Sequence, residues 1–280
     1  MHITPHTILQ SKARRTKHAG ESDPPDANDR AFVVALARGL EVLNCFHGGD
    51  SVLSSREIAR RCKLSRNRLA RLIHTLTVLG YLQYDDQAFA YRLGTASITL
   101  AGANVTQQDV RRMAQPLMEA LAELSGADVA LAIRDRMNMV CIQVCRRRTA
   151  VTLSLDVGTP IPLTRSAIGK AYLVAAPMAE RSDLLVRLRD ADEYTWPRTK
   201  TVIDNASREY FSTGFCIALE EWQHGVNEIA VPFFPGGGLP GMVFAVCGPM
   251  PRLSPDYLRN EIAPRLLELC QGLPRPSVMR

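Results

Sequence analysis

The segment from residue 54 to residue 82 combines two short helical patterns with a strong concentration of positive charge. Ser54 and Glu57 form a capping-box pattern that opens the first helix, and Ser65 is placed to cap a second helix that Gly80 ends. Residues 51–80 contain seven basic side chains and one acidic side chain, so this stretch carries seven minus one, or +6. The whole chain also carries +6, so the rest is balanced in charge. A positive surface on one helix pair attracts a phosphate backbone.

The elements around this segment complete a known arrangement. Apolar residues at spacings of three and four predict a helix over 33–46. Alternating residues predict strands over 81–84 and 89–93, joined by a turn at 85–87. Three helices followed by a hairpin are typical of a winged helix-turn-helix.

A helical wheel for residues 66–79 separates a core face from an exposed face. The core face carries Leu69, Leu72, Ile73 and Leu76. The N-terminal half of a recognition helix enters the major groove first, so we expect base contacts from Arg66, Asn67, Arg68 and Arg71. Arginine can bind guanine and asparagine can bind adenine in a bidentate manner. Phosphate contacts are expected from Arg56, Arg60 and Ser65, with Thr75 on the flank of the helix and Arg92 on the hairpin.

The rest of the chain divides into a tail, a linker and a second domain. The length of 280 residues suggests two domains. Residues 1–30 are polar and without period, and predict a disordered tail, and residues 31–95 hold the winged helix-turn-helix DNA-binding domain. Residues 96–125 predict a helical linker with an apolar stripe, which Pro116 should break or kink near Ala114 or Gln115. The expected stripe consists of Val110, Met113, Leu117, Leu121 and Leu124.

Residues 126–275 predict an α+β domain around an antiparallel sheet. Strand patterns occur near 129–133, 140–144, 151–155, 215–219, 226–234 and 241–247. Helical patterns occur near 166–176, 179–190 and 199–212, and a last helix is expected over 254–271. Strands joined by hairpins, with the helices gathered elsewhere, favour this class over a parallel sheet.

The cysteine pattern and the absence of common motifs exclude several classes of protein. Seven cysteines without a CxxC pair fit a reducing, cytoplasmic location, and each is expected to be a buried apolar residue. No stretch approaches the length of a membrane span. Gly169-Lys170 lacks the remainder of a P-loop, so we expect a tight helix start with a solvated lysine. Cys141 and Cys145 have no neighbouring histidine, and neither a metal nor another cofactor is predicted.

The chain resembles the IclR-type bacterial transcription regulators over about residues 31–272. The helix-turn-helix blocks that carry the resemblance are Leu36 to Leu43, Glu57 to Arg61, Leu64-Ser65, Arg71-Leu72, Thr75-Leu76, Leu79 to Leu82 and Tyr91 to Gly94. Pro162 to Ala171 resembles the family segment PLHATALGKA, and Ile229 to Pro232 and Val246 to Pro249 resemble two further blocks. The stretch Phe32 to Phe46 is most similar to the branch that controls aromatic-acid breakdown, the PcaR and PobR type.

This resemblance implies a GAF-like effector-binding domain that senses a small organic acid and regulates a catabolic operon. It also implies double-stranded operator DNA as a partner, a homodimer paired through the DNA-binding domains or a dimer of dimers (a homotetramer), and RNA polymerase if the protein is an activator. The implied effector pocket is lined by Leu153, Ala167, Ile168, Val226, Glu228, Ala245 and Cys247.

Two pocket positions depart from the family pattern. Glu228 stands where a small residue is common, and Ala167 replaces a glycine or similar residue. A carboxylate repels an anionic ligand unless it is protonated, paired or turned away. The effector is then either less anionic than usual, or held by Arg165 or by backbone N–H groups at the start of the 166–176 helix; Glu228 is alternatively a paired structural residue.

A ligand-responsive transcription factor is therefore the leading hypothesis. The alternative is a cytosolic enzyme acting on a small metabolite, with the N-terminal domain as a partner-docking module. That alternative requires a set of catalytic groups in residues 126–272, and Cys247, Glu228, His224 and Asp156 show no spacing that unites them. A solvated basic face on a protein-interaction domain is the other reading of the helix pair, which the caps and the hairpin disfavour.

Overall fold

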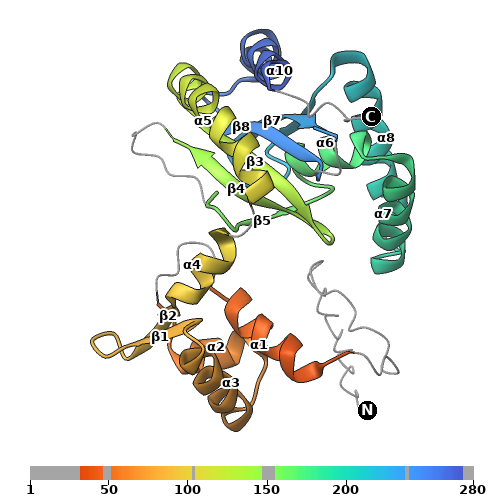
Figure 1. Ribbon diagram of the computed structural model, residues 1–280. Helices are drawn as coiled ribbons and strands as arrows, with labels where there is room; N and C mark the ends of the chain where they lie inside the picture. The colour runs from red at the N-terminus through yellow and green to blue at the C-terminus, as the bar shows by residue number, and fades with distance from the viewer. Residues whose placement is uncertain (1–31, 47–51, 103–104, 147–154, 237–239, 274–280) are drawn as a thin grey trace, which may run out of the picture.

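The computed structural model describes residues 32–46, 52–102, 105–146, 155–236 and 240–273. The predicted tail, Leu153 and most of the 151–155 strand pattern lie outside these residues. Figure 1 shows a small helical part with a hairpin at one end of the chain and a larger part built on a sheet at the other. None of the helices in the described ranges is long and apolar enough to cross a membrane.

The N-terminal part is a winged helix-turn-helix, as predicted. Helices α1 (Val34–Asn44), α2 (Ser55–Cys62) and α3 (Arg66–Val78) precede strands β1 (Leu82–Asp85) and β2 (Ala90–Leu93). The two strands pair antiparallel, and Leu53 adds a bridge to Tyr91. Val42, Ile58 and Leu69 are among the buried residues that hold the three helices and the hairpin together.

The caps of α2 and α3 follow the sequence with one difference. The Ser54 hydroxyl accepts a hydrogen bond from the Glu57 N–H at 3.3 Å. Ser65 has the extended backbone of an N-cap, but its side chain makes no capping hydrogen bond. Gly80, with φ +77°, takes the left-handed conformation just beyond α3.

The predicted break at Pro116 is wrong. Helix α4 (Thr95–Gly102) is followed by α5 (Val105–Ser125), which continues through Pro116. Helix α5 packs against β3, β4 and α10 of the second domain, and this burial offsets the cost of a proline in a helix. The stripe also differs, because Ala114 and Met118 are buried whereas Met113, Leu117 and Leu124 are exposed.

The second domain is built on a six-stranded antiparallel sheet in the order β5-β4-β3-β8-β7-β6. Its strands are β3 (Asp128–Asp135), β4 (Asn138–Cys145), β5 (Pro160–Pro162), β6 (Cys216–Leu219), β7 (Val226–Phe233) and β8 (Met242–Pro249). Strand β5 was not predicted, because its two prolines argue against a strand. It lies at the edge of the sheet, where a missing N–H donor is tolerated.

Helices cover both faces of this sheet (Figure 1). Helices α5 and α10 (Ala263–Gly272) contact one face, and α6 (Ala167–Ala175) contacts the other, flanked by α7 (Met178–Ala191) and α8 (Trp196–Thr213). The single predicted C-terminal helix is divided into a short α9 (Pro255–Tyr257), a π-helical turn (Leu258–Ile262) and α10. The wider turn precedes Pro264, which has no N–H for a regular helical bond.

The two sheet faces differ in side-chain size. The face toward α5 and α10 carries large residues such as Leu131, Phe233 and Phe244. The face toward α6 carries small residues, among them Ala130, Ala132, Cys216, Ala218, Ala230, Ala245 and Cys247. Small side chains allow α6 to lie close to the sheet.

Candidate DNA interface and effector site

Helix α3 presents its basic side chains to solvent because its apolar side chains are fixed in the core. Leu69, Ile73 and Leu76 are buried, and Leu72 packs against the same cluster, as the wheel predicts. All nine side chains predicted to contact DNA are exposed. They are Arg56 and Arg60 on α2, Ser65, Arg66, Asn67, Arg68, Arg71 and Thr75 at and on α3, and Arg92 on β2.

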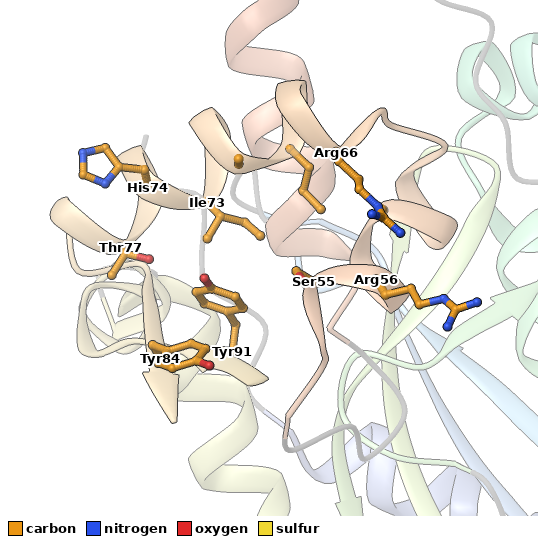
Figure 2. Close-up of a pocket in the computed structure, with 11 residues that line it drawn as sticks. Ser55, Arg56, Arg66, Ile73, His74, Thr77, Tyr84 and Tyr91 are labelled. Carbon is orange, nitrogen blue, oxygen red and sulfur yellow. The ribbon is translucent and has the colours of Figure 1, made fainter. Parts of the chain in front are cut away.

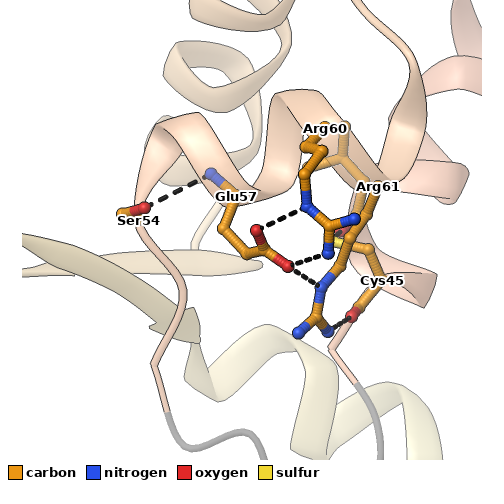
Figure 3. A network of polar contacts seen from close by, with 6 residues as sticks. Cys45, Ser54, Glu57, Arg60 and Arg61 are labelled. Carbon is orange, nitrogen blue, oxygen red and sulfur yellow. Dashed lines mark hydrogen bonds and ion pairs between the residues drawn. The ribbon is translucent and has the colours of Figure 1, made fainter.

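Part of this positive charge is neutralised within the domain. Arg60 and Arg61 both bind the Glu57 carboxylate, at 2.6 Å and 2.8 Å (Figure 3). These hydrogen bonds lower the pKa of Glu57 to about 2. The expected return bond from Glu57 to the N-cap is replaced by these ion pairs. Arg61 also donates to the carbonyl oxygen of Cys45 at 2.9 Å and so joins α2 to the end of α1.

Two other predicted contact residues also have internal partners. Arg92 donates to Gln83 at 3.3 Å and lies 3.9 Å from the Asp85 carboxylate. The Thr75 hydroxyl donates to the Arg71 carbonyl oxygen at 2.9 Å. By contrast, no hydrogen bond or ion pair engages the guanidinium groups of four arginines within the described ranges. These four are Arg56, Arg66, Arg68 and Arg71.

A hollow lies between α2, α3 and the hairpin (Figure 2). Arg56 and Arg66 border it at one end, and their guanidinium groups extend on the same side. Tyr84 and Tyr91 border it on the hairpin side, with ring centroids 5.0 Å apart. These two tyrosines were not predicted as site residues, although they occupy paired positions of the predicted hairpin.

The predicted effector residues that the structure describes come together beneath α6. Ala167 and Ile168 begin that helix, and Val226, Ala245 and Cys247 belong to the same buried cluster. Glu228 is paired in register with Cys247 on one side and with Ala218 on the other. The structure therefore gathers six of the seven residues, and Leu153 lies outside the described residues.

The Glu228 carboxylate is 1% exposed and lies at the N-terminus of α6. It accepts a hydrogen bond from the Ala167 N–H at 2.8 Å. Burial raises the pKa of Glu228 to about 7, whereas the Ala167 N–H and the charge of Lys170 act in the opposite direction. The Gly169 N–H, two residues further along the helix, donates to the Ser166 hydroxyl at 2.9 Å. Two of the N–H groups considered for an anionic effector, those of Ala167 and Gly169, thus have partners within the protein, and Arg165 is exposed.

The prediction of a solvated lysine at position 170 is wrong. Lys170 is buried, and its ammonium group donates to the Ile217 carbonyl oxygen at 2.8 Å and to Glu221 at 2.7 Å. This side chain ties α6 to β6 and to the loop that follows β6. The tight helix start is present, since a Cβ on Gly169 would lie 2.4 Å from the Cα of Leu163.

The cysteines and acidic residues do not gather into a metal site in the described part of the chain. All seven cysteines are buried, in agreement with the expectation from sequence, and none forms a disulfide. Burial raises the pKa of Cys141 and of Cys216 to about 12, so these thiols remain protonated and packed.

Comparison with known proteins assigns both parts of the chain. Residues 35–86 match the IclR helix-turn-helix domain, and residues 102–273 match the C-terminal domain of bacterial transcriptional regulators of the IclR type. The chain is 29% identical over 258 residues to the HTH-type transcriptional regulator TsaQ1/TsaQ2 of Comamonas testosteroni, covering 91% of this chain and 92% of that protein.

Solved structures agree with this assignment. An IclR family transcriptional regulator from Brucella abortus is 36% identical, with a TM-score of 0.70 and coverage of 89% of this chain and 94% of that one. An IclR homologue from Microbacterium hydrocarbonoxydans, complexed with 4-hydroxybenzoate, is 20% identical with a TM-score of 0.64, over 85% of this chain and 100% of that one. The domain order, the fold and the matched regions agree, and this chain belongs to the IclR family of transcriptional regulators.

Proposed function

We propose that this regulator binds operator DNA through α3 and responds to a small organic acid bound beneath α6. The observation that carries the DNA-binding part is the group of four exposed arginines on α2 and α3, which have no partner among the residues that the structure describes. An arginine already paired with a carboxylate must break that pair to contact DNA, whereas an unpaired one does not. The family membership supports the same conclusion.

Within this group, Arg66, Arg68 and Arg71 are proposed to read base edges together with Asn67. Arg56 lies on α2 beside the hollow and is proposed to bind a backbone phosphate, with Ser65. Arg60, Thr75 and Arg92 contribute less, because each is engaged within the protein. The hollow between Arg56, Arg66 and the two tyrosines is a path for one DNA strand along the hairpin.

The test is operator binding by single variants, measured by fluorescence anisotropy on a duplex selected from a random-sequence pool. Arg68→Ala and Arg71→Ala should each weaken binding by about 5- to 150-fold, the equivalent of one lost bidentate base contact. Arg56→Ala should reduce the salt slope of log K by about 0.9. The matched control is Arg187→Ala, an exposed arginine on α7 that is ion-paired with Asp183 at 2.9 Å.

Full affinity in both Arg68→Ala and Arg71→Ala would refute the proposed face. A loss of binding in Arg187→Ala would show that the assay reports general charge and not a specific surface.

The effector is proposed to be a small organic acid that competes with Glu228 for the Ala167 N–H. A ligand carboxylate cannot share this buried position with an ionised Glu228, because two like charges in a desolvated site repel. Binding of the acid therefore requires Glu228 to be neutral or displaced. The structural relative complexed with 4-hydroxybenzoate supports an aromatic acid as the first candidate.

Calorimetry with 4-hydroxybenzoate and with a series of aliphatic acids tests this effector class. For an acid that binds, the affinity of the wild type should rise as the pH falls below 7. The Glu228→Gln variant should bind the acid more tightly than the wild type at pH 8, and its affinity should depend little on pH. Trp222 packs against the buried cluster beneath α6, so its fluorescence provides a second signal. Weaker binding of every acid by Glu228→Gln at pH 8 would show that Glu228 holds the effector instead of competing with it.

The assembly is proposed to be a homodimer or a dimer of dimers that acts on an operon for breakdown of the effector. A two-fold dimer predicts an inverted repeat in the selected duplex, with half-sites about one helical turn apart or a multiple of it. If the protein is an activator, RNA polymerase is a further partner. Sedimentation of the complex with the selected duplex gives the number of protomers bound.

A further inference from the structure

Two cysteines of the DNA-binding domain meet where α1 and α2 end. Cys45 is the C-cap of α1, and Cys62 is the last residue of α2. Both residues are buried, at 6% and 9% exposure, in the same apolar cluster, and their side chains are neighbours. The Cys45 thiol also donates to the Val42 carbonyl oxygen at 3.0 Å, and the Cys62 thiol to that of Glu41 at 3.7 Å. The DNA-binding function uses neither of these side chains.

The surroundings make the two thiols unequal. The side-chain hydrogen bond shared with Cys45 lowers the pKa of Cys62, burial and the charge of Glu41 act in the opposite direction, and the positive charges of Arg38 and Arg61 lower it further. The hydrogen bond to Cys62 and burial raise the pKa of Cys45. A thiol that ionises more readily, next to one that stays protonated, is the arrangement of a reacting cysteine and its resolving partner. In Cys141, Cys216 and Cys247, burial is the dominant influence and raises the pKa.

We propose that Cys45 and Cys62 form a redox-sensitive pair that a peroxide oxidises to a disulfide, weakening the binding of DNA. The Cys62 thiolate attacks one oxygen of the peroxide, breaks the O–O bond and becomes a sulfenic acid, while the other oxygen leaves as water or an alcohol. The Cys45 sulfur then attacks the Cys62 sulfur, the S–S bond forms, and the sulfenic oxygen leaves as a second water. Two thiols are oxidised and one peroxide is reduced.

The effect on DNA follows from the position of Cys62, and this part rests on the proposed function. Cys62 directly precedes the turn that leads into α3, and Lys63 in that turn has a left-handed backbone with φ 52°. Hydrogen-bonded thiols must approach by more than about 1 Å to form a disulfide bond of about 2.05 Å. That movement draws the end of α2 toward α1. Arg61 opposes this movement of α2. Its side chain is already bonded to Cys45 at the end of α1 and to Glu57 on α2, and these bonds must change when the helix ends shift (Figure 3).

The experiment treats the reduced full-length protein with one equivalent of hydrogen peroxide, blocks the remaining thiols by alkylation and maps the disulfides by peptide mass. We expect the peptide containing Cys45 to be linked to the one containing Cys62, with the other cysteines alkylated. Anisotropy on the selected duplex should show roughly tenfold weaker binding after oxidation, corresponding to the loss of one base contact. Dithiothreitol should restore the affinity.

Single cysteine variants test whether the peroxide response depends on Cys45 and Cys62 and on no other cysteine. Cys45→Ala and Cys62→Ala should each abolish the peroxide response, and the control Cys141→Ala should retain it. Absence of the Cys45–Cys62 link in the peptide map, or full affinity for DNA in the linked protein, would overturn the inference. If the reduced protein bound no duplex at all, the proposed DNA function would fail. The peptide map would still decide whether the pair is a disulfide site.

Discussion

The buried carboxylate of Glu228 should make the stability of the second domain fall as pH rises through neutrality. In the folded protein burial raises the pKa of Glu228 to about 7, from an ordinary value of 4.5. Between these two pH values the folded state holds more protons than the unfolded state. The free energy of unfolding therefore decreases as pH rises, beginning near pH 4.5 and levelling off above pH 7.

The size of this effect follows from the two pKa values. Linkage gives a cost of about 1.4 kcal/mol at pH 5.5 and about 3.3 kcal/mol at pH 8, relative to a fully protonated protein. Glu228→Gln keeps an oxygen that can accept the Ala167 N–H, and it cannot ionise. The wild type should therefore lose about 2 kcal/mol relative to this variant between pH 5.5 and pH 8.

The chain offers a direct assay for this domain. It has two tryptophans, Trp196 and Trp222, and both lie in the second domain. Urea unfolding followed by tryptophan fluorescence thus reports that domain separately from the winged helix-turn-helix. The measurement compares wild type and Glu228→Gln at pH 5.5 and pH 8. Glu261→Gln, which removes a carboxylate ion-paired at the surface with Arg265 at 2.9 Å, serves as the control.

Parallel unfolding free energies for wild type and Glu228→Gln across this pH range would refute the reasoning. They would mean that Glu228 does not change its protonation there, and the proposed competition with an acidic effector would lose its physical basis. A loss of the pH dependence in Glu261→Gln as well would assign the effect to general surface charge.

Three further changes test the packing. Gly169→Ala should lower the free energy of unfolding by about 1–3 kcal/mol in the same fluorescence assay, because its Cβ would lie 2.4 Å from the Pro162 oxygen and the Leu163 Cα; wild-type stability would contradict that close contact. Ser54→Ala removes the cap bond to Glu57, and the amides of α2 should exchange with deuterium about fivefold faster, the equivalent of one lost cap. Pro116→Ala should stabilise α5 by up to about 3 kcal/mol, and a decrease in the urea midpoint would show that the proline fits a local bend.

Local signals explain why the N-terminal domain was predicted well and the second domain only in outline. The wheel of α3 depends on residues one turn apart, so its buried and exposed faces could be read directly from the sequence. Lys170 and Glu228 depend on distant partners instead. The bond from Lys170 to Glu221 spans 51 residues, and the bond from Ala167 to Glu228 spans 61. A solvated lysine was the reasonable expectation from sequence, because a lysine is buried only where the fold supplies such a partner.

The stripe on α5 shows a different limit. This helix carries two apolar rows, and the predicted stripe combined residues of both. One row contains Val110, Ala114 and Met118, and it is buried against the sheet, whereas Met113, Leu117 and Leu124 are exposed. Alanine carries little weight in an apolar pattern, yet it permits the closest approach to a sheet. Which of the two rows is buried depends on the shape of the sheet surface that α5 packs against. That shape cannot be inferred from the sequence of the helix alone.

The continuity of α5 also changes how a bound effector can influence DNA binding. The sequence predicts a break or kink of this helix near Pro116. In the structure this helix packs against β3, β4 and α10 through buried residues from Val110 onward, so we expect it to move with the sheet. A structural change at the effector site beneath α6 must therefore alter the sheet, or the helices packed on it, before it affects α5. Lys170 is well placed for this, because it joins α6 to β6 one turn after the Ala167 N–H that binds Glu228. Since a ligand shifts an equilibrium only by its differential affinity, displacement of Glu228 and movement of α6 are the events that an effector must favour.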